Sequence, residues 1–448
     1  MGKYFGTDGF RGEAGKGLTS LHAYDIGRFL GWYYGKEHRA RIVIGKDTRR
    51  SSYCLEDALC AGLTSSGADA YILHVTTTPS VSYVARTEDF DCGIMISASH
   101  NPFYDNGIKL INSKGEKMSE AVISEVEGYL ECEEPIIPFA TGEKIGRTED
   151  FAAGRNRYIG YLISLASHSY KGMRVGLDAS NGSAWMIAGS VFDALGAKTY
   201  IINNNPDGVN INENCGSTHI EGLCELVKRE NLDIGFAFDG DADRCLAVDC
   251  KGNILTGDHI IYMCAKYLKS KGQLSGNTVA ATIMSNMGLF RALDELGVKY
   301  IKTDVGDKNV YDAMQRDGLS LGGEESGHII FSKYATTGDG LITAIKVMEV
   351  LIESKLRSDE LCKGFRMYPQ YLVNVRVQDK NAVMTDKAVL EALETERQKL
   401  GTSGRILVRK SGTEPVVRVM AEAETELSCR EAVERVVKAI SLGGYTDN

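Results

Sequence analysis

The chain has 448 residues, of which 43% are hydrophobic and 25% are charged, and this length predicts about two to four domains of an ordinary globular protein. Its net charge of −9 argues against nucleic acid or an anionic membrane as the main partner. The 11 cysteines form no C-x-x-C pair, no signal core opens the chain and no apolar run spans a bilayer, so we expect a cytoplasmic protein with reduced thiols and no membrane partner.

The chain opens with a glycine-rich stretch, F-G-T-D-G-F-R-G, at residues 5–12. Three glycines and several polar side chains around Arg11 indicate a loop rather than a helix. Two interpretations remain open for the residues alone. One is a flexible terminal turn, and the other is an arginine placed beside a phosphate group.

A unit of strand, loop, helix, glycine and strand recurs three times. Its first strands are expected at residues 41–45, 173–177 and 278–281, and its second strands at residues 70–75, 199–202 and 299–302. This pattern predicts three α/β domains of the βαβ type. Each unit then supplies a further strand followed by a loop rich in polar side chains, at residues 97–102, 238–244 and 322–328. We expect these three loops to face one central cleft.

The pattern changes in the last part of the chain. Strands are expected at residues 371–377, 405–408 and 416–421, and helices at residues 387–400 and 426–440. The first of these helices has an apolar stripe of Val389, Leu390, Leu393 and Leu400. We therefore expect a smaller C-terminal α+β domain after three α/β domains with mixed sheets. Linkers and turns predict domains at residues 1–150, 151–252, 253–366 and 367–448.

The first polar loop, S-A-S-H-N-P, directly follows a short apolar strand. Pro102 lacks an amide hydrogen, so Ser99 and His100 are expected on a tight loop past the end of a strand, where ligands bind in open α/β sheets. Asn106 and Gly107 predict a turn that returns the chain toward Lys109, which would face the same loop. The residues alone are equally consistent with a serine-rich turn that has no chemical role.

Three aspartates, Asp239, Asp241 and Asp243, alternate directly after an apolar run. Alternate side chains of an extended backbone point the same way, so three carboxylates would repel one another without a cation. Oxygen ligands suit Mg²⁺, which also takes phosphate oxygens from a substrate. An EF-hand would need glycine and glutamate where this chain has Arg244 and Cys250. A phosphatase with Asp239 as nucleophile and a solvated acidic turn remain as alternatives.

The third polar loop, G-E-E-S-G-H, carries Glu324, Ser326 and His328. A carboxylate, a hydroxyl and an imidazole are suitable partners for sugar hydroxyls, although a polar turn would have the same composition. A fourth motif, R-K-S-G-T-E-P, begins at Arg409 in the C-terminal domain, with Arg418 beyond it. Cations, hydroxyls and a glycine favour a phosphate-binding loop over a basic surface turn. The nucleotide motif G-x-x-x-x-G-K-[S/T] is absent from the sequence.

These motifs, in this order and over nearly the whole chain, resemble the signatures of the α-D-phosphohexomutases. The N-terminal stretch, S-A-S-H-N-P with N-G-I-K, D-G-D-A-D-R, G-E-E-S-G-H and S-G-T-E-P all match. The resemblance implies that Ser99 carries a phosphoryl group that passes to and from the sugar. It also implies one Mg²⁺ per subunit, held by Asp239, Asp241, Asp243 and an oxygen of phosphorylated Ser99.

The resemblance also assigns roles around the transferring phosphoryl group. Arg11 and Lys109 would flank this group, with Lys109 or His100 as general acid or base. Arg244 would neutralise carboxylate charge or touch the phosphoserine. In the third loop, Glu324 and Ser326 would bind sugar hydroxyls and His328 would help as a donor or proton relay.

Two further positions would bind the substrate phosphate. Lys308 lies in a G-D-K turn that resembles a family turn with Arg or Lys near this phosphate. The fourth motif would hold the non-reacting phosphate through Arg409, Ser411, Gly412, Thr413 and Arg418. Lys410 stands where the family commonly has proline, and this leaves the geometry of the loop less defined.

The N-terminal stretch, G-E-E-S-G-H and S-G-T-E-P together are most similar to the bacterial members that interconvert glucosamine 6-phosphate and glucosamine 1-phosphate. This implies an isomerase, an intramolecular phosphotransferase that supplies amino-sugar and cell-wall precursors. Glucosamine 1,6-bisphosphate would be its bound intermediate and primer. The expected partner is a small sugar phosphate, and the expected assembly is a monomer or homodimer. A phosphomannomutase/phosphoglucomutase with the same mechanism and a metal-dependent sugar-phosphate phosphatase are the alternatives.

Overall fold

The computed structural model describes residues 3–6, 8–132, 137–411 and 415–446. The chain forms two compact units. The first comprises Met1–Met284 and Val298–Lys363, and the second comprises Ser285–Gly297 and Gly364–Asn448. Within the described ranges, none of the helices combines the length and the apolar character that a membrane crossing requires.

The first unit begins with a seven-stranded sheet in the order β1-β2-β6-β5-β3-β4-β7. Strands β3, β4, β5 and β7 run parallel, whereas β6 and β2 are antiparallel to their neighbours. The strands are β1 (Phe5–Gly6), β2 (Gly9–Glu13), β3 (Arg41–Lys46), β4 (Asp69–Val75), β5 (Cys92–Ile96), β6 (Asp105–Asn112) and β7 (Thr148–Asp150). The helices are α1 (Ser20–Tyr34), α2 (Arg50–Ser65), α3 (Thr78–Thr87) and α4 (Glu120–Leu130).

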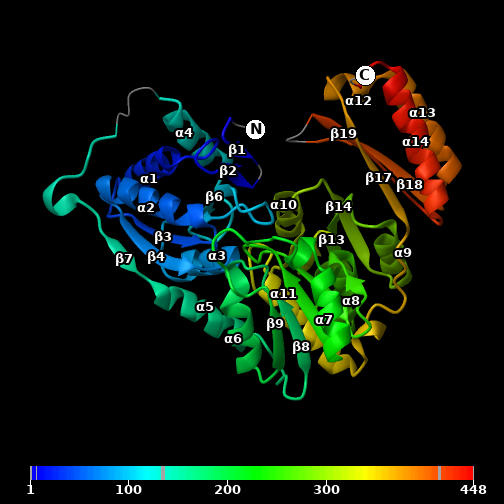
Figure 1. The fold of residues 1–448 in the computed structure, drawn as a ribbon, viewed down its shortest axis with the longest axis horizontal. Coiled ribbons are helices and arrows are strands. Elements are labelled where there is room, and N and C mark those ends of the chain that lie inside the picture. Colours follow the sequence, from blue (N-terminus) through cyan, green and yellow to red (C-terminus); the bar gives the residue numbers. More distant parts are fainter. Residues whose placement is uncertain (1–2, 7, 133–136, 412–414, 447–448) are drawn as a thin grey trace. The chain divides into compact units, whose positions relative to one another are not determined.

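The core of this first sheet explains why its central strands are continuously apolar. Alternate residues of β3 belong to different apolar clusters, with Ile42 and Ile44 in one and Val43 in the other. The pair α1 and α2, which lie side by side (Figure 1), packs into the first cluster, and α3 packs into the second. A sheet buried on both faces needs apolar residues at every position, as parallel sheets typically show.

The turn expected at Asn106 and Gly107 is wrong, because both residues lie inside β6. Gly107 pairs with Arg11 of β2, and its carbonyl oxygen accepts a hydrogen bond of 2.9 Å from the Ser97 amide. The chain reverses earlier, in residues 97–104, which we call the serine loop. Pairing with strands on both sides satisfies the backbone of β6 and outweighs the local preference for a turn.

The second and third sheets of this unit are also mixed. A five-stranded sheet, β12-β11-β10-β8-β9, is followed by a four-stranded one, β14-β13-β15-β16. The strands are β8 (Arg174–Asp178), β9 (Lys198–Ile202), β10 (Ile234–Phe238), β11 (Cys245–Asp249), β12 (Ile254–Leu255), β13 (Thr278–Thr282), β14 (Lys299–Thr303), β15 (Leu321–Gly323) and β16 (Ile329–Phe331). The helices are α5 (Ala152–Ser164), α6 (Ile187–Ala194), α7 (Glu221–Glu230), α8 (Gly257–Ser270), α10 (Asp307–Asp317) and α11 (Gly340–Ser354).

The second unit has an antiparallel sheet in the order β17-β19-β18. Its elements are β17 (Gln370–Arg376), β18 (Gly404–Lys410), β19 (Val416–Ala423), α9 (Met287–Glu295), α12 (Lys380–Thr385), α13 (Lys387–Leu400) and α14 (Glu426–Leu442). Helix α9 belongs to this unit although the sequence repeat groups it with the third α/β domain. The amide of Met287 donates to Glu422 Oε2 at 2.7 Å, which ties the start of α9 to β19.

The expected fold class is confirmed: three mixed α/β sheets are followed by a smaller α+β region. One expected core residue is wrong, because Leu390 is 45% exposed. Val389, Leu393 and Glu396 form the buried face of α13, and Leu390 lies beyond its edge. The domain boundaries after residues 150, 252 and 366 stay predictions.

Candidate active site

Ser99 lies in the serine loop, just past the end of β5, and is 1% exposed. Its backbone has a φ of +53°, a left-handed conformation that non-glycine residues rarely adopt. Its hydroxyl donates to Asp239 Oδ2 at 2.6 Å, across the boundary between the first and second sheets. The same hydroxyl oxygen is 3.3 Å from His100 Nδ1. A potential nucleophile is therefore held directly against an acidic group from another domain.

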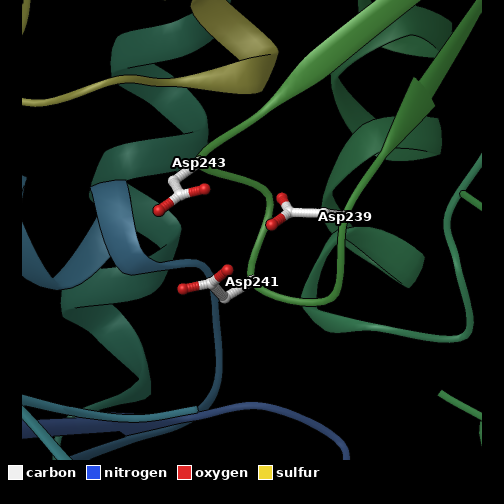
Figure 2. A group of neighbouring side chains, drawn as sticks. All are labelled: Asp239, Asp241 and Asp243. Carbon is white, nitrogen blue, oxygen red and sulfur yellow. The ribbon is translucent and has the colours of Figure 1, made fainter. Parts of the chain in front are cut away.

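The three aspartates lie in the loop that connects β10 and β11, with their carboxylates turned toward one another (Figure 2). Carboxylate oxygens of the three residues lie within 4.8 Å of one another, and all three residues are buried. The extended backbone expected from the sequence is wrong. The Ala242 amide donates to the Asp239 carbonyl at 3.0 Å and Ala242 has a φ of +57°, so a tight turn brings the carboxylates together.

The charges around this cluster suit a divalent cation. Burial, followed by repulsion from Asp243 and Asp241, raises the pKa of Asp239 well above its ordinary value. The Lys109 ammonium lies 2.7 Å from Asp241 Oδ2 and 3.5 Å from Asp243 Oδ2. Among the described residues, the other oxygen of Asp241 and that of Asp243 are buried without a hydrogen-bond partner. Unpaired buried carboxylate oxygens are the donors that Mg²⁺ prefers, so the residues present fit this ion.

Arg11 belongs to a network of charged side chains near this cluster. The network also includes Asp8 and Lys117, which the sequence did not single out. The Arg11 guanidinium pairs with Asp8, whose carboxylate also lies 3.1 Å from Lys117 and 3.6 Å from Lys109. Burial acts to raise the pKa of Asp8, but the surrounding cations outweigh it and hold the pKa well below its ordinary value. Lys117 also bonds Asp307 at 2.7 Å. Lys117 stands in no motif, so no sequence signal indicated it.

His100 contacts Ser99, Arg244 contacts Asp239, and the two side chains also contact each other. The Arg244 amide donates to Asp239 Oδ1 at 3.2 Å, and its Nη1 is 3.3 Å from His100 Nδ1. Burial and the cationic side chains of Arg244 and Arg11 lower the pKa of His100 to about 4. The imidazole is therefore neutral near pH 7, and its Nδ1 lone pair faces the Arg244 guanidinium, which can only donate.

The third loop places Glu324 directly after β15 and His328 directly before β16. The Gly306 amide donates to Glu324 Oε1 at 3.0 Å, and the Gly338 amide donates to His328 Nε2 at 2.9 Å. Burial opposes a charge on His328, but the carboxylates of Asp243, Asp307 and Glu324 raise its pKa to about 9. The Gly338 contact instead favours the neutral ring, because the accepting nitrogen cannot also carry a proton.

Two further sequence-predicted residues lie around the third loop. The Ser326 hydroxyl is buried and has no hydrogen-bond partner within the described part of the chain. Lys308, near the start of α10, pairs with Glu120. Lys308 and His328 line one cavity of about 310 Å³, together with Lys117. The structure therefore brings Lys308 to the third loop rather than to the aspartate cluster.

The fourth motif lies in the second unit, on two paired strands. Arg409 of β18 stands directly opposite Arg418 of β19 in the register, so the two side chains project from the same face of the sheet. The Ser411 amide closes the hairpin by donating to the Val416 carbonyl at 2.9 Å. Gly412 and Thr413 lie outside the described residues.

Sequence reasoning also missed the residues that hold the serine loop. Arg49 donates to four carbonyl groups of residues 99–105, and Asn212 donates to two of them. Arg49 stands in the stretch K-D-T-R at residues 46–49, between β3 and α2, which belongs to none of the motifs described above. Its function depends on contacts 50 or more positions away in the chain, which a local pattern does not reveal.

Four family models together match most of the chain. The chain matches the four descriptions "Phosphoglucomutase/phosphomannomutase, alpha/beta/alpha domain I" at residues 2–135, domain II at residues 156–252, domain III at residues 256–368 and "C-terminal domain" at residues 372–439. These ranges include every motif identified in the sequence.

Individual proteins are similar over almost their full length. The chain is 65% identical to the phosphoglucosamine mutase of Lachnospira eligens, with 99% of this chain and 100% of that protein covered. It is 59% identical to the phosphoglucosamine mutase of Lachnoclostridium phytofermentans, with 99% of each covered.

Solved structures share the fold at lower identity. A phosphoglucomutase/phosphomannomutase family protein of Burkholderia thailandensis has a TM-score of 0.81 at 23% identity, covering 100% of this chain and 99% of that one. The N-acetylphosphoglucosamine mutase of Aspergillus fumigatus, solved with GlcNAc-6P and magnesium, has a TM-score of 0.71 at 17% identity, covering 99% of this chain and 96% of that one.

Proposed function

This chain belongs to the phosphoglucosamine mutases of the phosphoglucomutase/phosphomannomutase family, and on that premise we propose that it interconverts glucosamine 6-phosphate and glucosamine 1-phosphate through phosphorylated Ser99. The observation that carries the proposed mechanism is the 2.6 Å contact between the Ser99 hydroxyl and Asp239. It joins the buried serine loop to the buried carboxylate cluster.

The first step transfers the phosphoryl group from Ser99 to the free hydroxyl of the sugar monophosphate. The bond between phosphorus and Ser99 Oγ breaks, a bond to the sugar oxygen forms, and the sugar hydroxyl loses its proton. The product is glucosamine 1,6-bisphosphate, which remains bound and then returns its other phosphoryl group to Ser99. Such transfer depends mainly on positioning and on stabilising charge, so the surrounding side chains decide the rate.

The chain's own residues supply both requirements. Lys109, which pairs with Asp241, and Arg11, which pairs with Asp8, would supply positive charge to the transferring group, and Arg244 holds the Asp239 carboxylate through its amide. His100, 3.3 Å from Ser99 Oγ, and Lys109, 2.7 Å from Asp241, are the two candidates for the general acid or base. Asp239, Asp241 and Asp243 would hold one Mg²⁺ per subunit, which supplies positive charge to the oxygens of the transferring group.

The substrate would be held by residues outside the transfer centre. Glu324, Ser326 and His328 would bond sugar hydroxyls, and Lys308 would contact a phosphate group from the same cavity. In the second unit, Arg409, Ser411 and Arg418, with Gly412 and Thr413, would bind a phosphate group. We further propose a cytoplasmic enzyme, a monomer or homodimer, that acts on no nucleic acid and is primed by the bisphosphate.

A coupled assay tests this proposal. Metal-supplied protein primed with glucosamine 1,6-bisphosphate is offered glucosamine 1-phosphate, glucose 1-phosphate and mannose 1-phosphate in parallel. We expect a preference for the glucosamine ester of about tenfold or more, which is about 1.4 kcal/mol in barrier. Preference for glucose or mannose would overturn the substrate, and release of free phosphate in place of an isomeric product would overturn the mutase mechanism.

A further inference from the structure

Arg49 is a fully buried arginine whose every donor faces a specific acceptor. It lies just before α2, and its Nε donates to the Asp47 carboxylate at 2.8 Å. Its two terminal nitrogens donate to carbonyl oxygens of the serine loop and the first residue of β6. These are the carbonyls of Ser99 at 2.9 Å, Asn101 at 2.8 Å, Asp105 at 3.0 Å, and Pro102. A guanidinium has five N–H donors, so its whole capacity is used.

Arg49 and Ser97 together hold both peptide groups of Ser99. The Ser99 carbonyl accepts from Arg49, while the Ser99 amide donates to Ser97 Oγ at 3.0 Å. The Ser97 hydroxyl in turn donates to Asp47 Oδ2 at 2.7 Å, the same oxygen that accepts from Arg49 Nε. The hydrogen bonds that join Ser99, Arg49, Asp47 and Ser97 therefore form a closed ring. Ser99 itself has a φ of +53°. Such a backbone conformation costs energy and persists only where surrounding contacts enforce it.

The second domain contacts the same carbonyl. The Asn212 side chain donates to the carbonyls of Ser99 at 2.9 Å and Asn101 at 3.1 Å. Gly240, between two of the clustered aspartates, approaches so closely that a Cβ there would lie 2.5 Å from the Ser99 carbonyl oxygen. The contacts of the Ser99 carbonyl with Arg49, Asn212 and the backbone near Gly240 therefore fix the distance between Ser99 and the aspartate loop.

We propose that Arg49, assisted by Asn212, is a positioning residue that holds the serine loop so that Ser99 Oγ meets the aspartate loop in a reactive geometry. This inference rests on the proposed phosphoryl-carrying role of Ser99. All five donors of Arg49 bond acceptors within the protein, so it acts on the rate of transfer rather than on substrate affinity. A displacement of about 1 Å in a reacting group can cost on the order of 100-fold in rate.

The test compares two charge-conserving substitutions of buried arginines in one domain. Arg49→Lys removes the planar fork that serves five acceptors, because lysine offers three donors on a single nitrogen. Arg28→Lys is the matched control. Arg28 is 2% exposed and donates to the carbonyls of Ser65 at 2.9 Å and of Ile137, so it performs the same kind of carbonyl bonding away from the serine loop.

For both variants and the wild type, intact-mass spectrometry follows the phosphorylation of Ser99 by glucosamine 1,6-bisphosphate. Thermal unfolding and the kcat and KM for glucosamine 1-phosphate are measured on the same preparations. We expect both substitutions to lower the unfolding temperature, but only Arg49→Lys to slow phosphorylation and kcat, by on the order of 100-fold, with KM little changed. Equal phosphorylation rates and equal kcat for the two variants would overturn the positioning role.

A milder variant decides the question if Arg49→Lys does not fold. Asn212→Ala removes only the two bonds from the second domain, and we expect phosphorylation to slow by about tenfold. An unchanged rate would overturn the inference. Failure of the wild type to acquire phosphate on Ser99 would instead remove the proposed function and the inference together. Normal phosphorylation of the wild type with no effect in the variants would remove the inference alone.

Discussion

The two regions proposed to bind phosphate groups are built in opposite ways. In the first unit, Ser99, Lys109 and Asp239 are almost completely buried, and each is held by residues from distant parts of the chain. In the second unit, Arg409 and Arg418 lie half-buried on neighbouring strands, and their spacing follows from local strand register. The difference indicates that the transfer chemistry needs fixed long-range geometry, whereas holding a phosphate group needs only two adjacent cations.

The sharpest contrast between the two regions comes from Ser99→Ala. Loss of the hydroxyl removes the atom that carries the phosphoryl group, so we expect kcat to fall by about 1,000-fold or more, at about 1.4 kcal/mol per factor of ten. The coupled assay measures this loss, and thermal unfolding checks that the fold is intact. Full activity in this variant would contradict the phosphoserine mechanism and favour Asp239 as the nucleophile.

Gly240→Ala tests whether long-range geometry limits the rate. The added methyl group would lie 2.5 Å from the Ser99 carbonyl oxygen, so the aspartate loop must move away from the serine loop. We expect kcat to fall on the order of 100-fold. The matched control is Gly160→Ala in α5, where a Cβ has no neighbour within 4 Å and should stabilise the helix by up to about 1 kcal/mol. An unchanged kcat in Gly240→Ala would show that the close approach is dispensable.

Arg409→Gln should affect binding rather than transfer. Loss of one charged donor to a phosphate group costs about 1.5–3 kcal/mol, so we expect KM to rise by about tenfold or more with kcat little changed. Lys410→Gln is the control on the next residue of β18, because successive side chains of a strand face opposite sides and Lys410 bonds Asn381 at 3.0 Å. Equal effects of the two substitutions would argue for general attraction instead of a defined phosphate site.

Buried acids of the first unit should also make its stability depend on pH. Burial raises the pKa of Asp339 to about 6, although it accepts hydrogen bonds from two amides and from Tyr158, and Arg86 acts to lower it. A folded-state pKa above the unfolded value means that stability is present at low pH and is lost as pH rises. Relative to Asp339→Asn, the wild type should lose up to about 3 kcal/mol between pH 4 and pH 6. Denaturant unfolding at several pH values checks this, and a constant difference would contradict it.

Short motifs in the sequence located part of the site in the first unit. The apolar run before each short motif placed Ser99 and the three aspartates at the end of a sheet, whereas the role of Ser99 came from the resemblance of its motif to a known family. The reason given for the aspartates was nevertheless wrong, since a turn at Ala242 gathers them rather than an extended strand. Short motifs therefore reveal which residues share a site more reliably than they reveal the backbone that brings them together.

The sequence did not indicate Arg49, Asn212 or Lys117, because none of them belongs to a short motif. Each derives its role from a partner far along the chain, as in the contact between Lys117 and Asp307, which are 190 positions apart. The misassigned turn at Asn106 and Gly107 has a related cause, because pairing with β2 and β5 overrode a strong local signal. Features that depend on tertiary contacts leave little trace in the pattern of a single sequence.

The most direct test of the phosphoserine mechanism is the chemical identity of the phosphorylated residue. Wild-type protein is incubated with radiolabelled glucosamine 1,6-bisphosphate, and the labelled site is mapped and treated with hydroxylamine, which cleaves acyl phosphates but leaves phosphoserine intact. The account predicts a hydroxylamine-stable label on Ser99 that is passed to added glucosamine 1-phosphate. A hydroxylamine-sensitive label on Asp239, or label recovered only as free phosphate, would contradict it.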